Sequence, residues 1–220
     1  MGTILASAIV DEAESILGDS GNNRYDAADH LIALNDGQRE AAIIKPDVSV
    51  TQVSTALVAG TKQSLTAGGI QLIAIIRNMG VSPGTTPGNA IKLVDMDFMN
   101  SSIPDWHVVA SHAASATVIN YMFDLRNPTV FYVYPAQPAS GFGYVDMIYS
   151  VTPAEVSALT GAITLDDIYK GALVDYIVYK ALSREADVVK HGQRANAHYS
   201  YFARALGVKD AKEEQDDPNR

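Results

Sequence analysis

The sequence predicts an α+β protein in which a helical bundle, built from the N- and C-terminal helices, carries a β-rich insertion. Two observations favour this class. Apolar residues recur at helical spacing near both ends of the chain, and β-branched and aromatic residues dominate from Val48 to Val151. We expect a helical body of residues 1–47 and 160–207, an insertion domain of residues 48–159, and a flexible C-terminal arm of residues 208–220.

Two helices are expected in the N-terminal part. The first falls between residue 4 and Gly18, and its apolar face is Ile4, Leu5, Ala8, Ile9, Ala13, Ile16 and Leu17. The second starts near Asp26, a favourable N-cap residue. It ends at about Ile44, because the residue before Pro46 avoids the helical conformation.

The insertion is expected to contain short strands joined by turns. We predict strands at residues 53–58, 70–77, 91–94, 118–123, 130–134 and 144–151. Asn127-Pro128 joins two of them in a hairpin, and Asp95 caps a short helix. Gly60-Thr61-Lys62 resembles only the end of a phosphate-binding loop and is interpreted as a turn.

Two further helices are expected after Gly161. Thr164 opens a sequence similar to a capping box, and the helix that follows has its apolar side at Ile168, Ala172, Leu173, Tyr176, Ile177 and Tyr179. The last helix is predicted from about Arg184 to Leu206. Gly207 stands where a glycine that ends a helix belongs.

The segment 208–220 has the composition of a polar arm. Eight of its thirteen residues are charged, so it cannot bury a core of its own. We expect it to order on a partner; the alternative is an ordinary frayed terminus. The residues expected to make that contact are Val208, Lys209, Asp210, Ala211, Lys212, Glu213 and Glu214.

Charge and composition exclude several classes of protein. The formal net charge is −9 and lysine and arginine form no cluster in the sequence, which argues against a nucleic-acid-binding protein. The chain has no cysteine, which excludes disulfides and thiolate zinc sites and fits a cytosolic or a virion protein. No apolar run is long enough for a transmembrane helix, and no signal peptide is recognisable.

Few residues have the spacing of a catalytic or metal site. Asp105, His107 and His112 lie close in sequence and offer oxygen and nitrogen ligands, which leaves a metal-dependent hydrolase as one alternative. Their spacing fits no metal-binding motif, and the ordinary polarity of a loop explains them better. We therefore expect no enzyme activity, no metal and no cofactor.

The second helix carries two amides on its apolar side. At about 100° per residue, Asn35 and Gln38 fall in line with Leu31 and Ala42. A buried amide without a partner costs about 1–3 kcal/mol. We expect the two amides to form a structural polar core, with partners in the backbone of the strands that enter and leave the insertion.

One predicted strand of the insertion alternates its side chains. Phe131 and Val133 point to one side, and Tyr132 and Tyr134 point to the other. The tyrosine side is the candidate interface to a neighbouring subunit or a tail protein, because aromatic residues are enriched at interfaces. The alternative is a two-sheet sandwich in which both sides are core.

Five motifs occur in a characteristic order along the chain. The first, RYDAADHLIALNDGQRE, covers residues 24–40; RNMG (77–80), PDWH (104–107), FYVYP (131–135) and ITLDDIY (163–169) follow. This order resembles the phage head-to-tail adaptor proteins, the head-completion or tail-tubular-protein-A-like family. Tyr25 stands where that family usually has tryptophan.

The resemblance implies a structural virion protein, assembled in the host cytoplasm. Such adaptors form a ring, usually of twelve copies, that docks under the portal protein through a C-terminal extension. The ring extends the DNA channel and offers a platform to tail nozzle or tail-fibre proteins, without membrane contact. DNA would pass without specific binding, which the acidic net charge favours. A tail-side ring, as a terminator or nozzle component, is the alternative.

Overall fold

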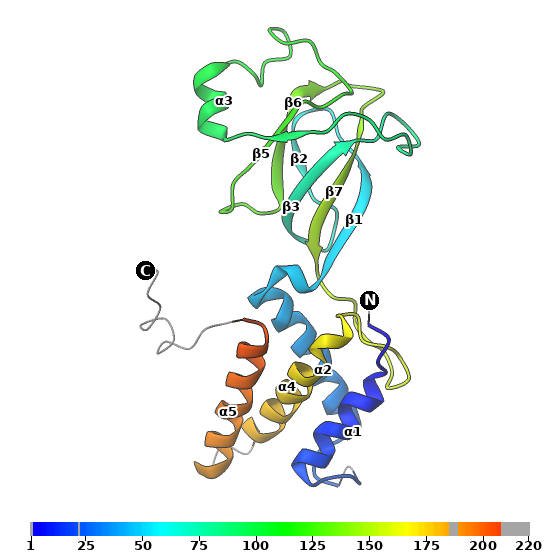
Figure 1. Ribbon diagram of the computed structural model, residues 1–220, viewed down its shortest axis with the longest axis vertical. Coiled ribbons are helices and arrows are strands. Elements are labelled where there is room, and N and C mark those ends of the chain that lie inside the picture. The colour runs from blue at the N-terminus through cyan, green and yellow to red at the C-terminus, as the bar shows by residue number, and fades with distance from the viewer. Residues whose placement is uncertain (1, 22, 185–188, 208–220) are drawn as a thin grey trace. The chain divides into compact units, whose positions relative to one another are not determined.

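The computed structural model describes residues 2–21, 23–184 and 189–207 (Figure 1). It divides into two compact units, Met1–Ser49 with Pro153–Arg220, and Val50–Thr152. The first unit is helical, and the second holds two β-sheets and one short helix. The predicted α+β class, with helices at both ends of the chain, is confirmed.

The helical unit is built around α4. Its helices are α1 (Ala6–Leu17), α2 (Ala27–Ile44), α4 (Lys170–Ser183) and α5 (Val189–Ala205), with the short 3-10 helices η1 (Pro46–Val48) and η2 (Asp167–Tyr169). α4 packs against α1, α2 and α5, as Figure 1 shows. Side chains from all four helices are fully buried between them, including Ile9, Leu34, Leu173, Ile177 and Phe202.

Residues 153–159 belong to the helical unit, although the sequence placed them in the insertion. The backbone N–H of Ala6 donates to the carbonyl of Gly161 at 2.8 Å, and that of Ser7 donates to Leu159 at 2.9 Å. These bonds to the start of α1 explain why the division falls at Thr152 rather than at residue 159.

Local signals place the ends of α1 and α2 where the sequence predicted them. Gly18 adopts the left-handed conformation (φ 71°) that ends α1. The Asp26 carboxylate accepts the N–H of Ala28 at 3.0 Å and so caps α2. The buried face of α1 differs from the prediction, because Ala6 and Val10 are buried while Leu5 and Ile16 are nearly half exposed.

The start of the C-terminal helices needs two corrections. The side-chain N-cap is Asp166, which caps η2 just before α4 by accepting the N–H of Ile168 at 3.0 Å, and not Thr164. Ile168 is 78% exposed and therefore lies outside the core. Arg184, the predicted start of the last helix, instead caps the end of α4, and the last helix is described from Val189 onward.

The β unit contains two sheets. The first has the antiparallel order β1 (Val50–Ala56), β7 (Tyr144–Val151), β3 (Gly69–Asn78). The second has the order β2 (Gly60–Ser64), β6 (Val130–Gln137), β5 (Asn120–Phe123), β4 (Lys92–Leu93), in which only β4 and β5 are parallel. The predicted hairpin is the β5–β6 pair. β2 was not predicted, because its first three residues, Gly60-Thr61-Lys62, have the sequence of a turn.

The core of the β unit lies between its two sheets. Phe131 and Val133 of β6 share one buried cluster with Leu72 of β3 and Met147 of β7. A second, smaller cluster covers the other side of the four-stranded sheet. It is formed by Met99 of α3 (Met96–Ser102), Trp106 and Met122. Across the described residues, no helix has the length and apolarity that a membrane crossing requires.

Candidate functional site

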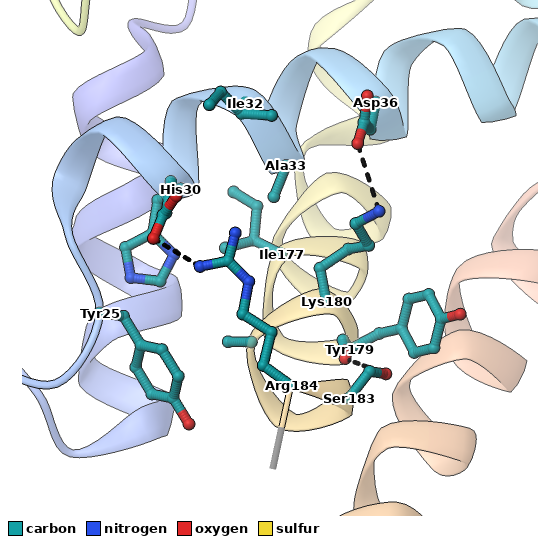
Figure 2. Close-up of a pocket in the computed structure, with 12 residues that line it drawn as sticks. Tyr25, His30, Ile32, Ala33, Asp36, Ile177, Tyr179, Lys180, Ser183 and Arg184 are labelled. Atoms are coloured by element: carbon teal, nitrogen blue, oxygen red, sulfur yellow. Dashed lines mark hydrogen bonds and ion pairs between the residues drawn. The ribbon is translucent and has the colours of Figure 1, made fainter. Parts of the chain in front are cut away.

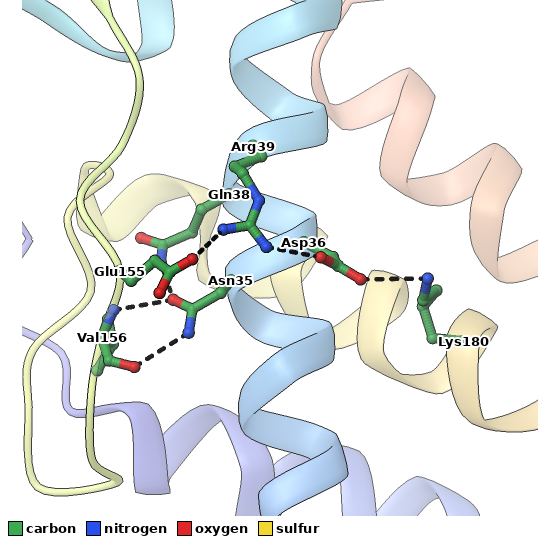
Figure 3. Close-up of polar contacts among 7 residues, drawn as sticks. All are labelled: Asn35, Asp36, Gln38, Arg39, Glu155, Val156 and Lys180. Carbon is green, nitrogen blue, oxygen red and sulfur yellow. Dashed lines mark hydrogen bonds and ion pairs between the residues drawn. The ribbon is translucent and has the colours of Figure 1, made fainter. Parts of the chain in front are cut away.

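The two amides predicted on α2 bind the segment that follows β7 (Figure 3). Asn35 exchanges two hydrogen bonds with the backbone of Val156: its amide nitrogen donates to the carbonyl at 3.0 Å, and its oxygen accepts the N–H at 2.9 Å. The side-chain oxygen of Gln38 accepts the N–H and the hydroxyl of Thr164 at 2.8 and 2.7 Å. Their partners come from the segment that leaves the β unit.

Four charged side chains extend this contact across α2 (Figure 3). Glu155 pairs with Arg39 at 2.6 Å, Arg39 with Asp36 at 2.8 Å, and Asp36 with Lys180 of α4 at 3.2 Å. Burial acts to raise the pKa of Asp36, but the hydrogen bonds from Arg39 and Lys180 outweigh it and lower that pKa. The network ties α2 to α4 on one side and to the segment 153–165 on the other.

The ionic part of this network was not predicted. Asp36 and Arg39 are three residues apart on a helix, which is the usual spacing of a surface ion pair. That signal was available in the sequence. Glu155 and Lys180 carry no local signal, because they approach α2 only through the tertiary fold.

A pocket of about 410 Å³ lies between α2 and α4 (Figure 2). Two ion pairs cross it, Asp29 with Arg184 and Asp36 with Lys180. The hydrogen bond from Arg184 lowers the pKa of Asp29. Since opposite charges already neutralise each other here, the pocket presents no net charge to a ligand.

His30 lies at one end of this pocket and is only 2% exposed. Among the described residues, no hydrogen-bond partner reaches its Nε2 atom. Burial lowers the pKa of His30 below its ordinary value of 6.5, although Asp19 and Asp29 act in the opposite direction. Burial therefore favours the neutral imidazole. No local pattern in the sequence indicates that His30 is buried.

The structure does not bring Asp105, His107 and His112 together as a metal site. His112 bonds to Asp105 at 2.9 Å, whereas His107 bonds to the hydroxyl of Thr61 at 2.8 Å and stacks on Trp106. Within the described ranges, no three histidine, aspartate or glutamate side chains are grouped so that they could hold a metal ion.

Tyr132 and Tyr134 are half-buried beneath the segment that follows α3. Tyr132 meets the rings of Trp106 and His107 edge-on, with centroids 6.0 and 5.6 Å away, and Tyr134 meets His112 at 5.9 Å. Both pack against the smaller cluster, while Phe131 and Val133 lie in the main core. An interface with a neighbouring subunit or a tail protein at these tyrosines stays a prediction.

The predicted contact residues of the C-terminal arm, 208–214, lie outside the described residues. The point where the arm begins is described. Leu206 is 3% exposed and Gly207 adopts a left-handed conformation (φ 91°) directly after α5. The arm therefore leaves from a fixed position on the helical unit.

The comparison with protein families assigns the chain to a class. A family described as the SU10 adaptor protein matches residues 4–220, which is nearly the whole chain. The matched class is that of phage head-to-tail adaptors, which are structural components of the virion. The chain belongs to the SU10 adaptor protein family. A comparison with curated proteins found no match.

Family membership confirms the resemblance drawn from the five motifs. A phage adaptor associates with other capsid and tail proteins, and is a component of the virion. The side chains described above fit a structural role of this kind. The contacts of Asn35 and Gln38, like the ion pairs around them, connect parts of the same chain.

Proposed function

We propose that this chain forms a ring, of twelve copies, that docks under the portal, extends the DNA channel and provides the platform for the tail. The match of the adaptor family over residues 4–220 is the observation that carries this proposal. The net charge of −9 supports it, because an acidic channel makes few contacts with DNA phosphates.

Attachment to the portal is assigned to the arm of residues 208–220. Its polar composition suits a segment that orders on a partner, and its start at Leu206 and Gly207 is fixed on the helical unit. Val208 and Ala211 are its small apolar contacts. Lys209, Lys212, Asp210, Glu213 and Glu214 supply charges of both signs.

Deletion of residues 208–220 tests this assignment. The shortened chain should keep its melting temperature, because Leu206 and the core of α5 remain. Its Kd for purified portal rings should rise at least about tenfold, which corresponds to a loss of roughly 1.4 kcal/mol. A chain with the same thirteen arm residues in scrambled order is the matched control for charge alone.

Two outcomes would contradict this assignment. Wild-type affinity of the shortened chain for the portal would show that the arm is not the docking element. Binding of the full chain to tail proteins, but not to the portal, would instead favour the tail-side ring.

A further inference from the structure

Two helices of the helical unit carry charge of a single sign. α1 contains Asp11, Glu12 and Glu14 and no lysine or arginine. α5 contains Lys190, Arg194 and Arg204 and no aspartate or glutamate. Figure 1 shows α1 and α5 on opposite sides of α4, which packs against both. The unit therefore has one acidic side and one basic side.

The basic side is a straight stripe along α5. Exposed residues recur at helical spacing on the face opposite the buried Ala195 and Phe202; they are Lys190, Arg194, Ala197, Tyr201 and Arg204. Tyr201 is 54% exposed. In the described part of the chain, no ion pair engages Lys190 or Arg194. We call these five residues the basic face of α5.

The acidic side is the exposed face of α1, formed by Ala8, Asp11, Glu12, Ser15 and Ile16. Ile16 is 43% exposed and supplies apolar surface. Glu12 also pairs with Lys170 of α4 at 2.7 Å, while Glu14 is buried and takes no part in this face. We call these five residues the acidic face of α1.

We propose that the basic face of α5 in one copy packs against the acidic face of α1 in the next copy. This inference rests on the proposed ring and identifies its subunit contact. A ring needs a heterologous contact, in which two different surfaces of each copy meet. Two matched faces on opposite sides of one unit meet that requirement. Their opposite charges orient the copies, and Tyr201 and Ile16 add apolar area.

A second copy of the chain accounts for both charged faces, whereas DNA accounts only for the basic face. Duplex DNA would account for Lys190, Arg194 and Arg204, since phosphates attract cations. It would leave the cation-free α1 without a role. A neighbouring copy uses both faces, and the contact can repeat around a closed ring.

A charge exchange between the two faces tests the proposal. The first variant, Asp11→Lys with Ser15→Lys, changes the net charge of the exposed face of α1 from −2 to +1 and keeps the Glu12–Lys170 pair. The second variant, Lys190→Glu with Arg194→Glu, makes α5 acidic. Each variant alone then carries charge of the same sign on both faces. Sedimentation velocity at low salt should show that the assembled fraction of the protein falls at least tenfold. An equimolar mixture should assemble again, because each variant complements the other at both faces.

The matched control for the α5 variant is Lys62→Glu with Lys92→Glu, which changes the net charge by the same −4 at two exposed residues of the β unit. It should assemble like the wild type. Single variants that assemble normally, or a mixture that stays dissociated, would overturn the α1–α5 contact and leave the ring itself standing. A wild-type chain that stays monomeric at every concentration would overturn the contact, and portal binding would then test the adaptor role separately.

Cross-linking gives a second readout that does not depend on charge. The chain has no cysteine, so Ser15→Cys and Ala197→Cys place one thiol on each face. With a short bismaleimide, the double variant should form a ladder of oligomers, and each single variant at most dimers. Oligomers without cross-links would show that another surface forms the ring. Loss of duplex DNA binding in Lys190→Glu with Arg194→Glu, with assembly unchanged, would make DNA the partner.

Discussion

At the scale of single residues, Gln38 has the most precisely defined structural role. Its side-chain oxygen accepts the N–H and the hydroxyl of Thr164, and Gln38 itself is 1% exposed. Gln38→Leu would take this acceptor from the half-buried N–H of Thr164 and from the buried N–H of Leu165, which lies 3.4 Å away. We expect it to reduce the free energy of unfolding by about 1–3 kcal/mol, measured by urea denaturation.

A matched control is Gln193→Leu on α5, where the glutamine is exposed. That change should alter the free energy of unfolding by less than about 0.5 kcal/mol. Equal stability of Gln38→Leu and the wild type would contradict the role assigned to Gln38.

His30 predicts a dependence of stability on pH. Its pKa is lowered by burial in the folded chain, and lies at its ordinary value of 6.5 when the chain is unfolded. As the pH falls below about 6.5, the unfolded state binds the proton first, so folding becomes less favourable. His30→Gln stays neutral and should remove this part of the dependence. Urea midpoints measured between about pH 5 and 8 check it, and parallel profiles for the two chains would exclude the effect.

At the scale of elements, Gly37 sets how closely α2 approaches α4. A Cβ atom at Gly37 would lie 2.9 Å from Cδ1 of the buried Tyr176. Gly37→Ala gains about 1 kcal/mol of helix propensity but overpacks the interface by about 1–3 kcal/mol. We therefore expect a net loss of stability, measured by thermal unfolding.

Gly192 of α5 is the control for this prediction. No atom lies within 4 Å of the position that its Cβ would take. Gly192→Ala should therefore raise the free energy of unfolding by about 0.5–1 kcal/mol. A stabilising Gly37→Ala would show that α2 and α4 can separate at little cost.

Elements with local end signals could be predicted from the sequence. Asp26 and Pro46 bound α2, Asp95 caps α3, and the run of β-branched and aromatic residues from Tyr144 to Val151 marks β7. β2 could not be predicted, because GTKQS is polar and short, and it becomes a strand only by pairing with β6. The two amides of α2 could be predicted from the helical periodicity. The roles of Glu155, Lys180 and His30 could not, because they depend on tertiary contacts.

The basic face of α5 was missed for a related reason. Lys190, Arg194 and Arg204 are spread over fifteen residues of sequence and form no run. They share one face only when the sequence is placed on a helix, and the buried Phe202 shows that this face is the exposed one. Charge clusters on helices are therefore better sought at helical spacing than along the sequence.

At the scale of the whole molecule, the chain divides into two units with separate cores. The helical unit holds both ends of the described chain, and with them the proposed ring contact and the start of the arm. The β unit is a two-sheet sandwich with its own second cluster beneath α3. Family membership identifies the chain as a phage adaptor, and the ring and the portal contact follow as proposals.

Electron microscopy of the purified chain mixed with purified portal tests the central claim most directly. Negatively stained images should show a second ring, stacked coaxially on the portal. The ring should be absent when residues 208–220 are deleted. Portal particles that remain bare at saturating concentrations of the full, folded chain would contradict the account.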